Sequence, residues 1–177
     1  MDIIGTGLEI IKYTIPALIV LVSSYLIVNK FLISQNQRKQ FALFKDSQDI
    51  TLRLRLQAYE RLVVLMERIG PRQLIPRVYD PSMTVADLRQ AMTYTITAEF
   101  EHNLSQQIYI SYNAWELVKT AKEEIIKLIN ISATKVAQDN SSNDLAMMVL
   151  NITANLDKKL PNEVALEYIK KEVSQIF

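Results

Sequence analysis

No charged residue interrupts the stretch Tyr13-Thr-Ile-Pro-Ala-Leu-Ile-Val-Leu-Val-Ser-Ser-Tyr-Leu-Ile-Val-Asn29, which is 17 residues long and decides how the rest of the chain is arranged. At about 1.5 Å of rise per helical residue, a helix of this length covers roughly 26 Å. Apolar residues extend it on both sides, and Lys12 and Lys30 can reach the lipid headgroups, so it can cross a hydrocarbon core of about 30 Å. Residues 1–33 are therefore predicted to form an N-terminal segment with one transmembrane helix.

The charges on the two sides of this stretch predict its orientation. Two acidic residues and one basic residue precede it, whereas the 17 residues from Lys30 to Asp46 carry four basic residues and one acidic residue. Since positive residues stay on the cytoplasmic side, we expect a single-pass protein of the cytoplasmic (inner) membrane, with its N-terminus outside and its C-terminal domain in the cytoplasm. A cleaved signal peptide is the alternative, but it requires a basic start and a small-residue cleavage site, which this sequence lacks.

The composition of the chain indicates an all-α fold. The chain is 49% hydrophobic, and its 3 glycines and 5 prolines leave few breaks for a strand-and-turn architecture. Roughly 145 residues follow the predicted span, enough for one small domain with its own core. No cysteine is present, which excludes disulfides, thiol catalysis, iron–sulfur clusters and thiolate zinc sites.

Breaks in the helical pattern divide the part after the span into three regions. A basic stalk helix is expected over residues 34–70, because Gly70-Pro71 stops the helical pattern. Three prolines then predict a loop over residues 71–83. Thr84-Val-Ala-Asp87 has the spacing of a capping box, so a helical bundle is expected over residues 84–177.

Apolar residues at helical spacing predict which side chains form the core of this bundle. The first helix is expected to run from Thr84 to Ile108, with Leu104 on its apolar face. A second helix, capped at Ser111 or Asn113, is expected to bury Ile125. A polar cluster at residues 139–143 then predicts a loop, and Pro161 marks the first turn of the last helix.

A heptad-like seam in the stalk predicts an interaction surface. Its apolar residues follow one another at spacings of 4, 3, 4 and 3, and they are Leu52, Leu56, Tyr59, Val63 and Met66. This seam is the expected contact with a membrane or cytoplasmic protein partner or with a second copy of the chain. Trp115 is expected to be an anchor either in this interface or in the core. Two heptads are too few to exclude the alternative, in which the seam packs against the chain's own later helices.

The distribution of charge along the chain bears on binding to lipid and to nucleic acid. From Lys30 to Arg77 the chain carries 10 basic and 4 acidic residues, whereas from Val78 onward it carries 9 basic and 13 acidic residues. The basic stalk could contact anionic lipid headgroups, or its charges could simply follow the positive-inside rule. Nucleic-acid binding is not expected, because the arginines are not interleaved with aromatic residues.

Only one pair of residues suggests catalytic chemistry. Glu99 and His102 form a Glu-x-x-His pair, which on a helix shares one face and provides two ligands in di-metal carboxylate bundles. His102 is the only histidine in the chain, so a complete site would require a symmetric dimer. We therefore expect a non-enzymatic scaffold or accessory subunit with no cofactor and no metal, and a membrane-tethered metal enzyme built on Glu99 and His102 is the alternative.

Three segments give the chain a family resemblance. They are Leu52-Arg-Leu-Arg-Leu-Gln-Ala-Tyr-Glu-Arg-Leu62, Glu99-Phe-Glu-His-Asn-Leu-Ser-Gln-Gln-Ile-Tyr109 and Ala114-Trp-Glu-Leu-Val-Lys-Thr-Ala-Lys122. With these segments behind an N-terminal span, the chain resembles an uncharacterised bacterial family of single-pass, helix-rich membrane-anchored proteins, over most of its length up to about residue 131. The family has no assigned activity, so the resemblance implies an architecture and no function.

Overall fold

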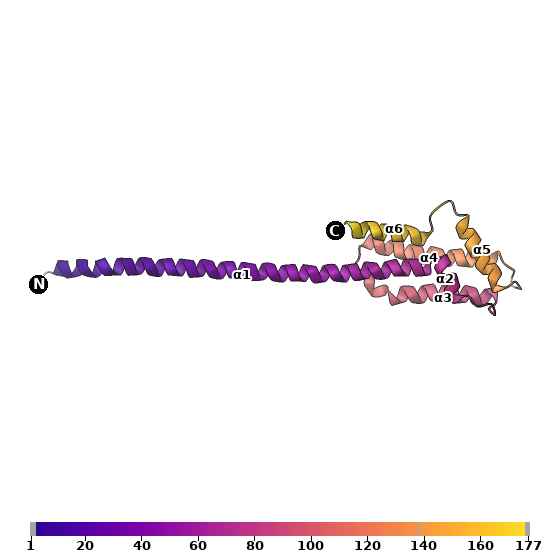
Figure 1. The fold of residues 1–177 in the computed structure, drawn as a ribbon, viewed down its shortest axis with the longest axis horizontal. Helices are drawn as coiled ribbons and strands as arrows, with labels where there is room; N and C mark the ends of the chain where they lie inside the picture. The colour runs from indigo at the N-terminus through magenta and orange to yellow at the C-terminus, as the bar shows by residue number, and fades with distance from the viewer. Residues whose placement is uncertain (1–2, 138, 176–177) are drawn as a thin grey trace. The chain divides into compact units, whose positions relative to one another are not determined.

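The computed structural model describes residues 3–137 and 139–175, and within these residues the chain is all-α (Figure 1). The helices, in chain order, are α1 (Ile3–Ile69), α2 (Pro71–Val78), α3 (Val85–His102), the 3-10 helix η1 (Leu104–Ile108), α4 (Tyr112–Thr134), α5 (Ser142–Ala154) and α6 (Pro161–Ser174). Residues 50–56 alternate between apolar and polar side chains, a pattern typical of a strand. They are nevertheless helical, within α1.

Contacts within the chain divide it into two compact units, and the boundary lies between Thr51 and Leu52. The first unit is the part of α1 up to Thr51, and the second contains the rest of α1 and all later helices. This corrects the expected organisation, in which residues 34–70 formed a stalk. The C-terminal half of the expected stalk is instead a helix of the bundle.

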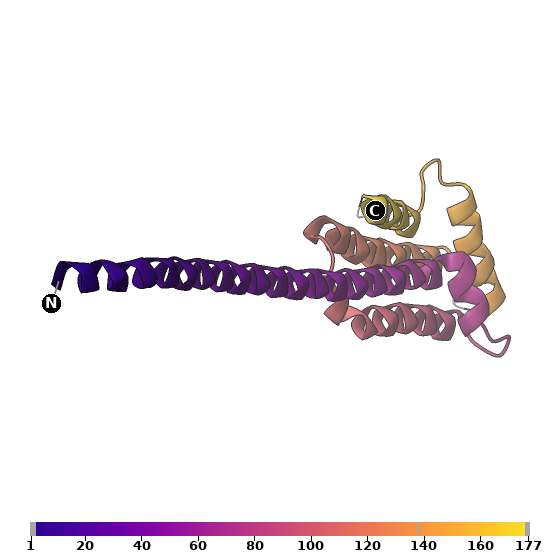
Figure 2. The same cartoon turned by 60° about the vertical axis from the view of Figure 1, so that its left-hand side comes forward.

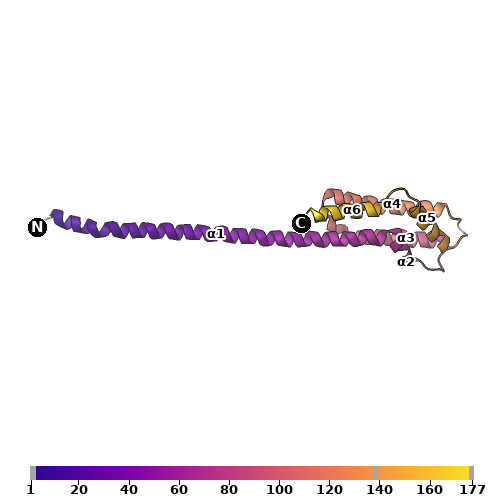
Figure 3. The same cartoon turned by 45° about the horizontal axis from the view of Figure 1, so that its top comes forward.

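The core of the second unit forms around this last part of α1. In Figures 1 and 2, α3 runs along one side of it and α4 along the other. Helix α6 packs on α4 (Figure 3), and α5 crosses the end of the bundle in Figures 1 and 2. Each of the α-helices contributes fully buried side chains to one continuous core, among them Leu62, Leu74, Ile96, Ile125, Leu145 and Ile169. Burial of apolar side chains from every α-helix is what holds the bundle together.

The starts of the later helices follow from local sequence signals. Thr84 and Asp87 form the expected capping box, in which the Asp87 amide donates to Thr84 Oγ1 at 3.1 Å and the Asp87 carboxylate accepts from the Thr84 amide at 3.1 Å. Ser111 caps α4 by accepting from the amide of Ala114 at 3.1 Å. Pro161 begins α6 as predicted. These bonds satisfy amides that have no partner within their own helix.

The loop expected over residues 71–83 is wrong in its first part, because Pro71–Val78 forms α2. Pro71 occupies the first turn, where its missing N–H would have had no partner. Pro76 removes one hydrogen bond from the helix, but Leu74 and Ile75 are buried in the core. Burying each such side chain contributes about 1.5 to 3 kcal/mol, which offsets the cost of the internal proline.

The helix expected to continue to Ile108 ends at His102 instead. Asn103 is buried, and its side-chain amide donates to the carbonyl oxygen of Glu99 at 2.8 Å, which satisfies an acceptor at the end of α3. The chain then turns into η1. As a result Leu104 is 41% exposed and is not a core residue, whereas Ile125 is fully buried as expected.

Gly70, between α1 and α2, is required by close packing. Its φ of −58° and ψ of 136° are accessible to any residue, but a Cβ would lie 2.8 Å from Nδ2 of Asn162. Asn162 is buried, and its Nδ2 donates to the carbonyl oxygen of Met66 at 3.1 Å. Gly70→Ala would displace this amide, so we expect a loss of about 1 kcal/mol of stability despite the lower entropy of the unfolded variant.

Thermal melts of the Gly70→Ala variant in the parent and in an Asn162→Ala background test this prediction. With Asn162 truncated the close contact disappears, so Gly70→Ala should cost little in that background. An equal loss in both backgrounds would show that Asn162 is not the residue that requires glycine at this position.

Candidate functional site

The residues of the predicted interaction seam face the interior of the bundle. Tyr59 and Met66 are 2% and 0% exposed and belong to the core, and Val63 packs against that core. Leu52 and Leu56 are half-buried. Tyr59 and Met66 therefore pack against the chain's own helices, which was the alternative to a partner contact. Neither side chain is accessible to a partner in this structure.

Trp115 is also a core residue in this structure. It is 7% exposed, and its ring stacks on that of Phe100 with centroids 5.2 Å apart and planes inclined by 22°. On α4, Lys122 Nζ lies 4.7 Å from the centroid of the Phe100 ring, a cation–π distance. Of the two expected roles of Trp115, the core anchor describes this structure, because its indole joins α3 to α4.

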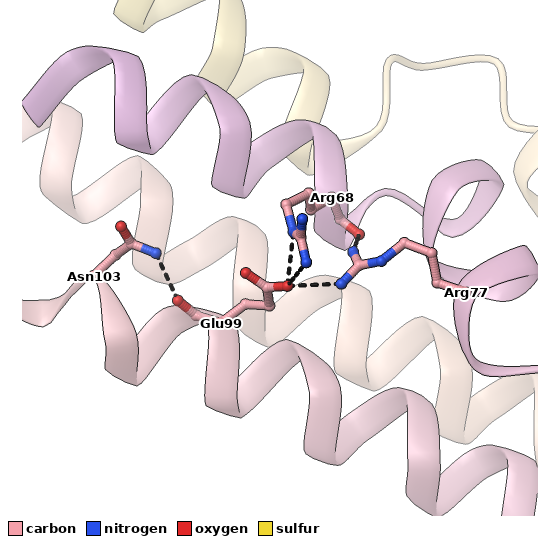
Figure 4. A network of polar contacts seen from close by, with 4 residues as sticks. All are labelled: Arg68, Arg77, Glu99 and Asn103. Carbon is pink, nitrogen blue, oxygen red and sulfur yellow. Dashed lines mark hydrogen bonds and ion pairs between the residues drawn. The ribbon is translucent and has the colours of Figure 1, made fainter. Parts of the chain in front are cut away.

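Glu99 is held by two arginines from different elements (Figure 4). Its Oε1 accepts hydrogen bonds from Arg68 Nε of α1 and from Arg77 Nη2 of α2, each at 2.7 Å. Arg77 Nη1 also donates to the carbonyl oxygen of Arg68 at 3.2 Å. One carboxylate thus links α1, α2 and α3 at the position where α1 ends.

These contacts control the protonation of Glu99. Burial on its own raises the pKa of Glu99, but the hydrogen bonds and positive charges of Arg68 and Arg77 outweigh burial and hold the pKa below the ordinary value of 4.5. The side chain is therefore an ionised acceptor at neutral pH. A general acid would require the opposite shift.

Acidification is expected to remove the stabilisation that Glu99 provides. Because the folded pKa lies below the unfolded value of 4.5, this contribution is complete above that pH and is lost as pH falls through the folded pKa. The side chains of Arg68 and Arg77 are 46% and 33% exposed, so solvent limits the effect to about 1 kcal/mol. Thermal melts between pH 7 and pH 3 should show a smaller decline for Glu99→Gln than for the parent.

Glu101→Gln is the matched control for this titration. Glu101 is exposed and makes no ion pair with any described residue, so its variant should follow the parent at every pH. If the Glu99→Gln variant declines as steeply as the parent, another group causes the acid sensitivity.

A groove of about 520 Å³ lies beside this network, between α1 and α3. The lining includes Glu60, Arg61 and Arg68 of α1 and Glu99 and His102 of α3. The structure thus brings Glu60 to the same groove as the predicted Glu99–His102 pair. His102 is exposed and makes no hydrogen bond or ion pair with the described residues.

The donors in this groove do not form a metal centre within one copy of the chain. Among residues 3–137 and 139–175, no three side chains of His, Asp or Glu gather closely enough to hold a metal ion. Glu99, the first residue of the expected pair, is already bound by two arginines. The groove presents mixed charges on a partly apolar surface that includes Val64.

A second polar cluster, which sequence reasoning missed, joins α1 to α6. The hydroxyl of Tyr59 donates to Glu172 Oε1 at 2.7 Å, and Ser111 Oγ donates to Glu172 Oε2 at 2.8 Å. Arg55 Nε donates to the carbonyl oxygen of Tyr109 at 3.2 Å. Burial and the bond to Glu172 raise the pKa of Tyr59 above its ordinary value of 10.0, so the hydroxyl stays a donor at neutral pH.

This cluster fixes the last helix against the first. Residues 55 and 59 lie one turn apart on α1, but residues 111 and 172 are far from them and from each other in the sequence, so only the fold brings the cluster together. The heptad spacing of Tyr59 predicted a contact with a partner or with the chain's own helices, but it gave no indication of the partner of its hydroxyl group.

Comparison with known proteins adds a family to this description. No curated protein and no solved structure is detectably similar to the chain. One family model matches residues 6–176, which include the apolar part of α1 and the whole bundle. The protein therefore belongs to the family of unknown function designated DUF7935.

Proposed function

We propose that this protein is a non-enzymatic scaffold or accessory subunit, anchored in the cytoplasmic membrane by one helix, whose bundle binds a protein partner at the cytoplasmic face. One observation carries the proposal: apolar side chains are exposed on every side of α1 from Ile15 to Ile33, whereas the second unit buries a core of its own. The chain thus combines a helix that needs apolar surroundings with a bundle that does not.

The exposure of consecutive residues supports the anchor. Leu18, Ile19, Val20, Leu21 and Val22 are each at least 50% exposed, and five consecutive helical residues point in all directions around the axis. A helix that is apolar on every side is stable in a protein core or in a membrane. Within the described residues, α1 from Thr14 onward is the one helix that is long and apolar enough to cross a membrane.

The polar clusters of the bundle support a structural and not a catalytic role. Glu99 and Glu172, two partly buried carboxylates, accept hydrogen bonds from side chains of other elements. Each therefore joins helices of the same bundle and is not left free to react. The metal-enzyme alternative would require Glu99 to exchange two arginines for a metal ion.

A topology reporter tests the anchor and its orientation. We expect a reporter fused after Phe177 to be active only in the cytoplasm, because four basic residues lie between Lys30 and Asp46 and one precedes the span. Reporter activity on the opposite side of the membrane would refute the orientation. The control is a variant with Lys30, Arg38, Lys39 and Lys45 changed to glutamine. It should lose the preference for a cytoplasmic C-terminal domain, because these four charges set the orientation.

A further inference from the structure

A second groove, between α4 and α5, has an apolar floor. Its volume is about 320 Å³. Its floor consists of Leu128 and Ile131 of α4, Ile152 of α5, and Leu156 in the loop after α5. Ile131 and Leu156 are 45% and 44% exposed, so this floor is open to solvent. Leu128 and Ile131, three residues apart, lie on one face of α4.

Lysines surround this floor. Lys127, Lys135, Lys158 and Lys159 line the groove with a single acidic residue, Glu124, which gives the lining a net charge of +3. This contrasts with residues 78–177, which carry 9 basic and 13 acidic residues. The groove is therefore a local basic patch on an acidic bundle.

Two of these lysines are available to a ligand. Lys127 lies 3.4 Å from Glu124, and Lys159 is paired with Glu167 of α6. Lys135 and Lys158 are exposed and make no ion pair with any described residue. An apolar surface with free ammonium groups at its edge is complementary to a ligand that combines apolar and anionic groups.

We infer that this groove binds an acidic amphipathic helix of a protein partner. The volume of about 320 Å³ is about twice the roughly 150 Å³ that accommodates one benzene ring, which is room for two or three apolar side chains. Such side chains, spaced one turn apart on a helix, match the open floor, and carboxylates beside them match Lys135 and Lys158. This inference rests on the proposed function, because it specifies the chemistry of the partner.

Peptide binding to the full chain in zwitterionic nanodiscs tests this inference. The probes are two labelled amphipathic helices of 16 residues with the same leucines, one with glutamates and the other with lysines at the remaining charged positions. Empty nanodiscs measure the binding of each peptide to lipid alone. The acidic peptide should bind the protein at least about tenfold more tightly than the basic peptide.

Charge reversal at the edge of the groove assigns the binding to this surface. Lys135→Glu combined with Lys158→Glu should weaken binding of the acidic peptide about tenfold and strengthen that of the basic peptide. Lys170→Glu combined with Lys171→Glu is the matched control, because these residues are exposed on α6, do not line the groove and change the net charge equally. This control should leave the affinity within about twofold of the parent.

Three results of the peptide and lipid measurements would overturn the inference. They are equal binding of the two peptides by the parent, equal losses in the two double variants, and binding of a short-chain anionic phospholipid in the groove with no binding of the acidic peptide. Recovery of a protein partner from native membranes by both the parent and the groove variant would also reject this groove but would leave the proposed function intact. The proposed function fails separately if no partner is recovered with the parent.

Discussion

Ile125→Asp is expected to unfold the helical bundle, because it places an unpaired carboxylate in the middle of the core. Ile125 is fully buried on α4, and an uncompensated charge there adds several kcal/mol to the loss of apolar burial. A domain with a total stability of about 5 to 15 kcal/mol cannot absorb this cost together with the packing defect. Circular dichroism of the detergent-solubilised protein should show loss of the cooperative melt.

Leu104→Asp is the informative control for this experiment. The periodicity of the sequence places Leu104 in the core, but the side chain is 41% exposed in η1. We therefore expect a cooperative melt with a change of no more than about 1 kcal/mol. If the melt of the Ile125→Asp variant matches that of the parent, the face of α4 that carries Ile125 is not the buried face.

Trp115→Ala is the second substitution with a large expected effect. The indole is 7% exposed and stacks on Phe100 at a centroid distance of 5.2 Å. Its removal leaves a large cavity between α3 and α4, and such changes typically cost about 3 to 5 kcal/mol. Thermal or denaturant melts in mild detergent measure this loss directly.

Tyr94→Ala provides the comparison for Trp115. Tyr94 is an aromatic residue of α3 that is 73% exposed, so its truncation should change stability by no more than about 0.5 kcal/mol. If the Trp115→Ala variant retains the stability of the parent and loses only binding to a partner, Trp115 is an interface residue, as the sequence alone suggested.

The sequence predicted the elements that depend on short-range signals. The Thr84–Asp87 capping box, the Ser111 cap and Pro161 each mark a helix start that the structure confirms. These signals involve residues within one turn of each other, so they do not depend on the rest of the fold.

The errors in the sequence analysis arise where tertiary contacts outweigh local preferences. Pro76 argues against a helix, yet burial of Leu74 and Ile75 stabilises α2. The apolar stripe predicts a buried Leu104, yet the side chain of Asn103 ends the helix before it. In both cases the deciding interaction links residues whose proximity exists only after folding.

At the candidate site, too, short-range spacing was predictable and long-range contacts were not. The spacing of Glu99 and His102 predicted that they share one helix face, and both residues line one groove. It gave no indication that Arg68 and Arg77 hold Glu99, because these residues lie 31 and 22 positions away. The resemblance to an uncharacterised family is confirmed as membership of a family of unknown function, and the single-pass anchor is part of the proposed function.

Native mass spectrometry of the protein, released from its own membranes in mild detergent with metal analysis alongside, tests the central claim most directly. A membrane-anchored scaffold predicts a complex with a protein partner at fixed stoichiometry. This complex should persist in a His102→Gln variant, because His102 is exposed and makes no hydrogen bond or ion pair with any residue that the structure describes. A partner-free protein that carries a stoichiometric metal ion, and loses that metal in the His102→Gln variant, would contradict the account.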